Sequence, residues 1–295
     1  MSSISPQGVM HHRMTMPPDR RRGDSAFGRL RIWYPQVGST MDIAARLAAV
    51  GAPHGTVVET DFQHAGRGRQ GRPWVAPPGS ALLTSWILRA GDDPSSAGVL
   101  SPLAALAVLR AIRALVPGAP VGYKWPNDVL VEERKVAGIL LSSRPIEGEL
   151  VVIAGIGVNL DPPVGEGRAG RAGLRTWRAE LSIGELRDRL AAGLESIWQH
   201  YIARRSLEPG LRRELEELLV WHGERVEIEL PSGTATGRIV GLDAIGALRF
   251  AREASGTVET LHMGGIVRGP RRSPAEHSGP YRILSDAGRA ADEAQ

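Results

Sequence analysis

The stretch "YKWPNDVLVEERKVAGILL", residues 123–141, predicts a strand, a sharp turn and then a hairpin. Proline restricts the residue before it to extended backbone, so Pro126 ends the first strand at Trp125. Asparagine and aspartate, which follow at once, are favoured turn residues. The apolar run at the end of the stretch is typical of a buried central strand.

This stretch also holds both lysines of the chain. Of 36 Lys and Arg residues, only Lys124 and Lys135 are lysines. A compact ammonium suits a crowded site where a carboxylate meets a phosphate, whereas a wide guanidinium fork does not. Lys124 is therefore a candidate functional residue. The simpler interpretation, a turn with Trp125 in the core, explains the Pro, Asn and Asp but not the choice of lysine.

The bulk composition is that of an ordinary soluble globular protein. The chain has 295 residues, 42% hydrophobic and 23% charged, enough for one large domain or two modest ones. It has no cysteine, no apolar run of about 18 residues and no signal-peptide pattern. We therefore expect a cytoplasmic protein with no membrane partner. A net charge of +4 is too small to argue for nucleic acid on its own.

The pattern along the chain predicts an α+β protein in four parts. We expect strands at 31–37, 55–62, 81–89, 135–143 and 149–160, and helices at 39–51, 99–118, 182–201 and 208–221. Beyond them, short glycine-punctuated segments alternate with period two, which favours a small β-barrel. The predicted parts are a disordered tail (1–29), an α+β domain (30–220), a small β-barrel (221–268) and a flexible tail (269–295).

The segment "GRGRQGR", residues 66–72, is a second functional candidate. It matches G-x-G-x-x-G, but the proline-rich "RPWVAPPG" follows where a dinucleotide-binding loop needs a helix, so we reject that interpretation. Its glycines let the backbone approach a ligand, and Arg67, Arg69 and Arg72 offer forks for phosphate or carboxylate. A solvated basic loop that touches RNA is the other interpretation, and the loop alone leaves both open.

Several segments together resemble the catalytic domain of biotin protein ligases, a family related to lipoate ligases. They are "GST" (38–40), "DFQHAGRGRQGRPW" (61–74), "KWPNDV" (124–129), "KVAGILL" (135–141) and "GIGVNL" (155–160). The resemblance covers roughly residues 31–268. It implies a mixed-sheet catalytic domain with a small SH3-like C-terminal β-barrel. It also implies a short form that lacks an N-terminal DNA-binding domain, hence a ligase with no DNA partner.

The resemblance implies a two-step reaction. The carboxylate of biotin attacks the α-phosphate of ATP, giving biotinyl-5′-AMP and pyrophosphate, with Mg²⁺ accompanying ATP. A lysine of a biotin carboxyl carrier protein then attacks the mixed anhydride, and AMP leaves. An exposed strand edge could pair two subunits into a homodimer or dock the carrier.

The resemblance also implies roles for individual residues. Lys124 and Arg69 are expected to be catalytic. The expected biotin-binding residues are Ser39, Thr40, Met41, Gln63, Arg67, Gly68, Arg69, Lys124, Gly155 and Gly157. The expected contacts to ATP or the adenylate are Arg67, Arg72, Lys124, Lys135 and Asn159. Trp74 is expected to support the loop, Trp177 is a candidate to stack on adenine, and the metal ligands are unassigned.

Two residues depart from the family pattern: Met41 stands where an asparagine is common, and Gln70 replaces a basic residue of the loop. Two other functions are alternatives to biotin ligation. A lipoate or octanoyl ligase has the same fold, but the combination of "GRGRQGRPW" and "KWPND" argues against it. An RNA-binding module would interleave aromatic and basic residues, whereas only Trp74 lies near the loop.

Overall fold

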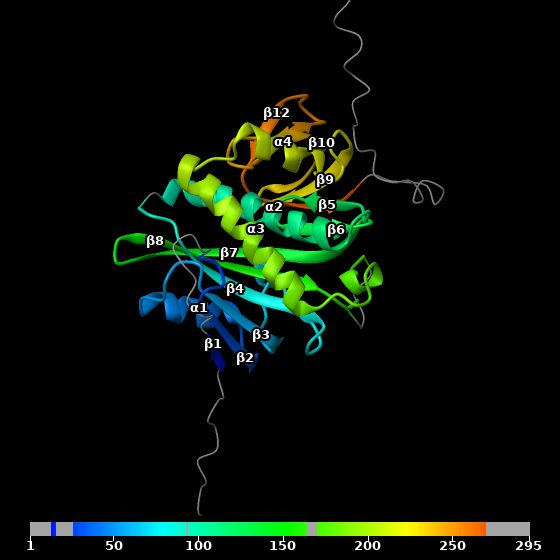
Figure 1. The fold of residues 1–295 in the computed structure, drawn as a ribbon. Coiled ribbons are helices and arrows are strands. Elements are labelled where there is room, and N and C mark those ends of the chain that lie inside the picture. The colour runs from blue at the N-terminus through cyan, green and yellow to red at the C-terminus, as the bar shows by residue number, and fades with distance from the viewer. Residues whose placement is uncertain (1–12, 16–25, 93, 164–169, 270–295) are drawn as a thin grey trace, which may run out of the picture.

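The computed structural model describes residues 13–15, 26–92, 94–163 and 170–269. Within these residues the chain forms an eight-stranded mixed sheet and a five-stranded antiparallel sheet. Figure 1 shows helices α2 (Leu100–Leu115) and α3 (Ile183–Arg204) crossing one face of the large sheet, with the small sheet beyond one end. The predicted α+β class with a mixed sheet is confirmed.

The large sheet has the strand order β1-β2-β3-β4-β8-β7-β6-β5. Its only parallel pair among the described residues is β2 with β3, which α1 (Thr40–Ala49) connects as a crossover. The strands are β1 (Arg13–Thr15), β2 (Arg31–Val37), β3 (Val57–Gln63), β4 (Ala81–Arg89), β5 (Val121–Lys124), β6 (Asp128–Val131), β7 (Arg134–Ile146) and β8 (Glu149–Asn159).

The two faces of the large sheet are buried by different helices. Along β4, Trp86 and Leu88 join the core under α2 and α3, while Ile87 joins the core under α1. This alternation follows from the period of two along a strand. Because both faces are covered, the central strands are apolar runs without visible alternation, as their sequences predict.

Local signals in the sequence fix where the helices begin. Ser39 caps α1 by accepting a hydrogen bond from the Met41 amide (3.3 Å), and Ser182 with Glu185 forms a capping box on α3. The segment 97–115, which includes α2, is apolar and long enough to cross a membrane, contrary to the composition-based expectation. It is 72% buried inside the protein, so it serves as a core helix.

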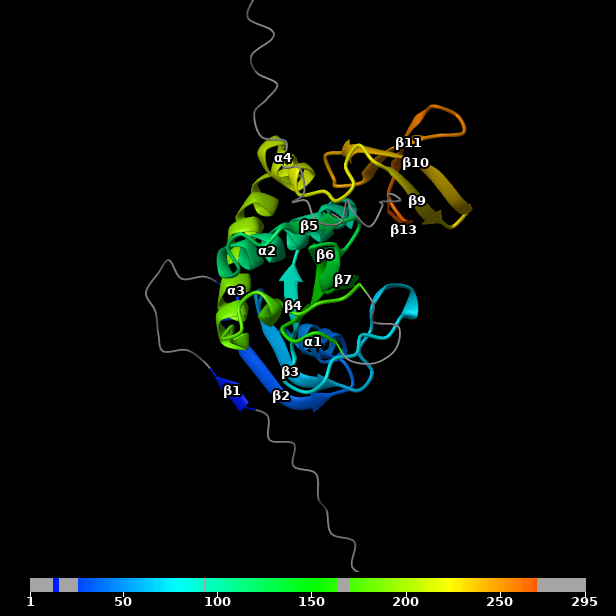
Figure 2. The same cartoon turned by 90° about the vertical axis from the view of Figure 1, so that its right-hand side faces the viewer.

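The small sheet follows α4 (Pro209–Glu217) and has the order β12-β11-β10-β9-β13. Its strands are β9 (Arg225–Leu230), β10 (Gly233–Leu242), β11 (Leu248–Arg252), β12 (Val258–Leu261) and β13 (Gly265–Arg268). The predicted barrel is wrong in one respect: the hydrogen-bonded order ends at β12 and β13 without closing. Figure 2 shows this open sheet beyond β5 and β6.

The connection into the small sheet runs along the edge of the large one. Tyr123 of β5 donates its amide hydrogen to the Leu218 carbonyl (2.6 Å) and accepts one from the Val220 amide (2.9 Å). This segment therefore extends the sheet past β5, which would otherwise be an open edge. It places the start of the small sheet beside the end of β5, where Lys124 lies.

The predicted disordered tail over residues 1–29 is wrong for two segments. Arg13–Thr15 forms β1, which pairs antiparallel with β2. Phe27 is 5% exposed and packs against Trp86 and Trp198. The rest of 1–25 and the predicted flexible tail, apart from Gly269, lie outside the described residues. The described residues also include short 3₁₀ helices, which are η1 (Arg69–Gly71), η2 (Pro94–Val99) and η3 (Leu174–Thr176).

Candidate active site

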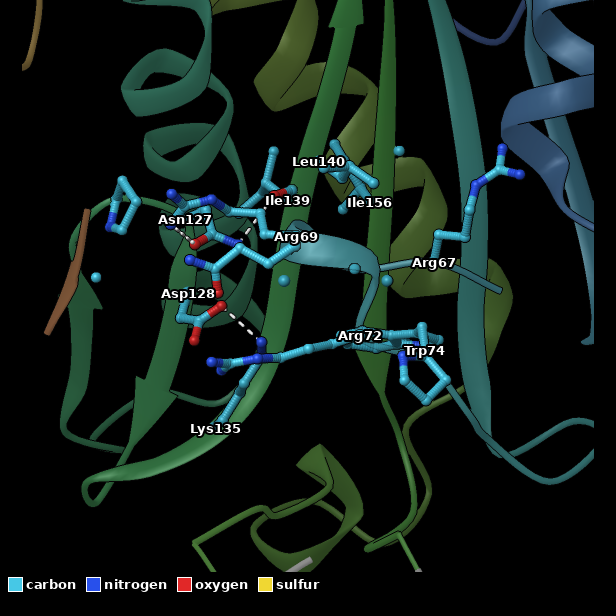
Figure 3. A pocket seen from close by; sticks show the side chains of 18 of the residues that line it. Arg67, Arg69, Arg72, Trp74, Asn127, Asp128, Lys135, Ile139, Leu140 and Ile156 are labelled. Carbon is cyan, nitrogen blue, oxygen red and sulfur yellow. Dashed lines mark hydrogen bonds and ion pairs between the residues drawn. The ribbon is translucent and has the colours of Figure 1, made fainter. Parts of the chain in front are cut away.

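A cavity of about 250 Å³ opens on the face of the large sheet that α1 covers. Four elements surround it: the start of α1, the loop 66–74, the turn after β5, and the segment before β13. Figure 3 shows how the side chains converge there. Twelve of the predicted site residues line it: Ser39, Thr40, Met41, Gln63, Arg67, Gly68, Arg69, Arg72, Lys124, Lys135, Gly155 and Gly157.

Glycines on β7 and β8 form the floor of the cavity. A Cβ on Gly157 would lie 2.6 Å from the Trp74 ring, and one on Gly155 would lie 2.9 Å from the Met41 sulfur. Gly138 of β7, which pairs with Gly157, also faces Trp74. The floor glycines therefore make room first for two protein side chains, Trp74 and Met41, which lie close over the sheet.

One end of the cavity presents neutral polar groups. The Thr40 amide donates to Gln63 Oε1 (2.8 Å), and the Thr40 hydroxyl lies 2.8 Å from the Ser85 hydroxyl. Because Gln63 Oε1 accepts from Thr40, the Gln63 side chain presents its amide nitrogen as a donor to a ligand. Ser39 uses its hydroxyl to cap α1. This end is suited to a small neutral group with both donors and acceptors.

The opposite wall is strongly cationic. Two carboxylates, Asp128 and Glu229, line the cavity against six cationic side chains: Arg67, Arg69, Arg72, Lys124, Lys135 and Arg171. This excess favours an anionic ligand at low effective dielectric.

The two lysines have different partners. Lys135 Nζ lies 2.6 Å from Asp128 Oδ1 and 5.6 Å from the centre of the Trp74 ring. Lys124 Nζ lies 5.6 Å from the centre of the Trp221 ring, and no carboxylate of the described residues lies within 4.0 Å of it. Burial lowers the pKa of Lys124, and the charge of Asp128 opposes this shift. Lys124 is thus a cation of the cavity wall that has an aromatic ring, but no carboxylate of the described residues, as its close partner.

Arg69 bridges the turn and the small sheet. Its guanidinium donates to Asn127 Oδ1 (3.1 Å) and to the Gly264 carbonyl (2.9 Å). Asn127 in turn donates to the Ile139 carbonyl (3.1 Å), which fixes the orientation of its amide. Burial lowers the pKa of Arg69. The turn after β5 and the segment before β13 therefore hold this guanidinium at the cavity wall.

The other two loop arginines point in different directions. Arg67 pairs with Asp42 on α1, and in Figure 3 it points away from Arg69 and Arg72. Arg72 extends towards Lys135, and its guanidinium lies 4.0 Å from Glu229. Each of the three loop arginines therefore has a partner within the molecule, although the side chains of Arg67 and Arg72 stay exposed to solvent.

Two of the predicted functional residues do not reach the cavity. The Asn159 side chain is buried and donates to the Ala172 carbonyl (3.2 Å). Trp177 donates to Glu132 (3.1 Å) and lies under the Arg134 guanidinium, away from the cavity. Gln70 lines the cavity with a left-handed backbone (φ 55°), a conformation that its sequence position gives no reason to expect.

Sequence reasoning assigned no ligand-binding role to several residues on the wall. Asn127 and Asp128 were interpreted as turn residues only. Their amide and carboxylate side chains lie close to Lys124 in the sequence, which could have indicated that they belong to the same site. Arg171 reaches the cavity because the backbone on either side of it pairs with Lys135. Gly264 contributes a carbonyl oxygen, which no side-chain pattern could reveal.

The donor set does not form a metal site of its own. Among the described residues, no three His, Cys, Asp or Glu side chains gather in one place. Asp128 is already paired with Lys135. Mg²⁺ therefore does not fit as a resident ion of these residues, and no chemical step is assigned to it.

Comparison with other sequences identifies similar proteins. A profile of the biotin/lipoate A/B protein ligase family matches residues 33–161. A biotin–[acetyl-CoA-carboxylase] ligase of Mycobacterium tuberculosis is 36% identical over 207 residues, which are 67% of this chain and 74% of that protein. A ligase of the same name from Paracoccus denitrificans is 50% identical over 100 residues, 33% of this chain and 41% of that protein.

Comparison with solved structures gives the same fold. The biotin protein ligase from Aquifex aeolicus in complex with biotin and ATP aligns with a TM-score of 0.67 at 26% identity. The alignment covers 81% of this chain and 98% of that one.

Proposed function

Since the chain belongs to the biotin/lipoate A/B protein ligase family, we propose that it activates biotin with ATP and transfers it to a lysine of a biotin carboxyl carrier protein. The observation that carries the proposal is the division of the cavity. One end has the neutral hydrogen-bonding groups of Thr40 and Gln63, and the opposite wall has an excess of cations. Biotin with ATP has the complementary chemistry, a neutral ureido ring joined through an alkyl chain to a carboxylate that meets a triphosphate.

In the proposed binding mode, the ureido group lies at the polar end. The Gln63 amide nitrogen donates to the ureido oxygen, and hydroxyl groups near Thr40 accept from the ureido nitrogens. The apolar body of biotin lies over the glycine floor beside Met41. The carboxylate then points towards Lys124, at the end of β5.

The cationic wall accounts for the first chemical step. A carboxylate oxygen attacks the α-phosphorus, and pyrophosphate leaves with the electrons of the broken P–O bond. Both reactants are anionic, so the ammonium of Lys124 and the guanidinium of Arg69 offset their repulsion and stabilise charge in the transition state. Arg72 and Lys135, which line the cavity, are the proposed contacts to the phosphates. Asn159 is a positioning residue, because it holds the backbone next to Arg171.

Loop 66–72 accounts for the protection of the product. The mixed anhydride hydrolyses if water reaches it, so a covering segment is needed between the two steps. The contacts of Arg67 and Arg69 hold this loop against α1, the turn and the small sheet. We infer that the loop retains biotinyl-5′-AMP until the carrier lysine arrives. Mg²⁺ accompanying ATP, a cytoplasmic location and a homodimer stay predictions.

The test is biotin-dependent exchange of pyrophosphate into ATP by the purified protein. We expect exchange with biotin, ATP and Mg²⁺, and transfer of biotin to a carboxyl carrier domain when that domain is added. Lipoate replaces the ureido ring with a disulfide that cannot use the Gln63 donor, so it should support little exchange. Exchange with lipoate or octanoate but not with biotin would contradict the proposal.

A further inference from the structure

A second cavity of about 290 Å³ lies behind Arg69. It is bounded by the residues before and at the start of α2 and by the small sheet. Arg69, Asn127 and Leu140 line both this cavity and the first one. The two spaces are therefore neighbours that share a wall.

The shared wall is held by polar contacts. The Arg69 guanidinium spans from Asn127 to the Gly264 carbonyl, with donor–acceptor distances of 3.1 and 2.9 Å. It is the one arginine or lysine that lines both cavities among the described residues. A group entering the second cavity would therefore meet Arg69 before it reached the reacting atoms.

The transfer of biotin to the carrier needs a route by which the carrier lysine reaches the adenylate. The carrier amine has to reach the carbonyl carbon of the adenylate while loop 66–72 stays closed, because an opened loop also admits water. The first cavity is occupied by biotin and nucleotide at that moment. A route through the second cavity, on the other side of Arg69, would let the amine enter while loop 66–72 stays closed.

The lining of the second cavity suits the side chain of a lysine. It is largely apolar or backbone, with Pro102, Trp125 and Ile245 among its walls, and it contains no Asp or Glu. One of its polar groups, the Tyr123 hydroxyl, is used within the wall, where it donates to the Pro126 carbonyl (2.7 Å). Such surroundings accommodate an alkyl chain and favour the neutral form of an amine, which is the nucleophile.

We propose that the second cavity is the access route for the acceptor lysine side chain, with Arg69 as the barrier between it and the adenylate. This rests on the proposed biotin ligase activity. The amine nitrogen attacks the carbonyl carbon and forms the C–N bond. The C–O bond to phosphate breaks, AMP leaves with its electrons, and the amine nitrogen releases a proton to water.

The mouth of the cavity offers a position for a blocking variant. Gly98 is exposed in η2, and a Cβ built there meets no atom within 4 Å. Gly98→Leu should therefore narrow the cavity without displacing the core. Gly210 of α4 also has no atom within 4 Å of a built Cβ and lines neither cavity, so Gly210→Leu is the matched control. His262→Trp places a larger side chain at a second position in the lining of this cavity.

The two half-reactions are measured separately. Pyrophosphate exchange reports adenylation, and single-turnover transfer from preformed biotinyl-5′-AMP to a biotin carboxyl carrier domain reports acylation. We expect Gly98→Leu and His262→Trp to slow transfer by about tenfold or more and to change exchange by less than about twofold. Hydroxylamine is small enough to pass through a narrowed cavity. It should therefore react with the bound biotinyl-5′-AMP nearly as fast in the variants as in the parent.

Transfer at the parental rate in both variants would overturn the inference, because the amine would then arrive by another path. Equal losses of exchange and transfer would also overturn it, since the second cavity would then serve adenylation. Absence of exchange in the unchanged protein has a different meaning. It contradicts the biotin ligase proposal, and the inference falls with it.

Discussion

Lys124 combines three properties that rarely occur together. It is one of two lysines in an arginine-rich chain, its side chain is partly buried, and no carboxylate of the described residues lies within 4.0 Å of its ammonium. A partly buried cation without such a partner is costly to maintain, so a protein retains one where a ligand supplies the counter-charge. The Trp221 ring is the protein's own partial compensation.

A Lys124→Arg variant tests whether the ammonium itself is needed. The guanidinium keeps the charge but is wider and lies further from the backbone, so it should misplace the charge in the crowded site. We expect pyrophosphate exchange to fall by about 100-fold while the melting temperature stays close to the parental value. Lys135→Arg is the comparison, with a smaller loss expected. Near-parental turnover in Lys124→Arg would contradict the assigned role.

The pH dependence of adenylation should report the same ammonium. Burial lowers the pKa of Lys124, so the charged form is lost at lower pH than for an ordinary lysine. Exchange should therefore fall as pH rises through that lowered pKa. Trp221→Leu removes a ring that favours the charged form and should move this alkaline limb to still lower pH. Trp221→Phe, which keeps a ring face, should move it less. An alkaline limb that does not respond to Trp221→Leu would contradict the pairing.

Loop 66–72 shows how one element serves several others. Arg67 contacts α1, Arg69 contacts the turn and the small sheet, and Arg72 lies near Glu229 of β9. These contacts hold the loop in place before any ligand is considered. A ligand beneath the loop would add contacts only in the closed arrangement, so binding should make opening rarer.

Limited trypsin digestion tests this closure, because Arg67 and Arg69 are cleavage sites within the loop. If the cleavable form binds no ligand, a concentration of about 100 times Kd stabilises the closed form by about 2.7 kcal/mol. We therefore expect cleavage within the loop to slow by about 100-fold with biotin and ATP together. Cleavage at other arginines is the internal control. Unchanged cleavage under those conditions would show that the loop does not close over the ligand.

The sequence predicts the secondary-structure elements better than it predicts the tertiary contacts between them. The strands at 31–37 and 81–89 and the caps at Ser39 and Ser182 follow from local patterns, and the structure reproduces them. The strand at Arg13–Thr15 depends on pairing with β2, so its polar sequence gives no warning. Trp177 lies outside the cavity because it contacts Glu132 and Arg134, which are far away in the sequence. Such pairings exist only in the folded chain.

At the scale of the whole molecule, the two sheets share one core. A single buried cluster includes Trp86 of the large sheet and Val226 and Ile239 of the small sheet. Gly246 packs its backbone directly against Pro102 of α2, where a side chain would not fit. The small sheet therefore behaves as part of the catalytic unit rather than as an appended domain.

A shared core predicts a single unfolding transition. Calorimetry should show one cooperative transition whose calorimetric and van't Hoff enthalpies agree, and biotin with ATP should raise its midpoint. Removal of the Arg69 contact in Arg69→Ala should weaken this shift while lowering the ligand-free midpoint only slightly. Two resolved transitions would show that the small sheet, residues 225–268, unfolds by itself.

The contacts of the two lysines determine which of them the enzyme could biotinylate on itself. The proposed intermediate acylates amines, and both side-chain amines of this chain, Lys124 and Lys135, lie within the cavity where it would form. Lys135 is engaged by Asp128, whose Oδ1 lies 2.6 Å from Nζ. Lys124, with its lowered pKa, is the more vulnerable of the two. Any biotin that the enzyme attaches to its own side chains should therefore be found at Lys124, and a peptide map can show whether it is there.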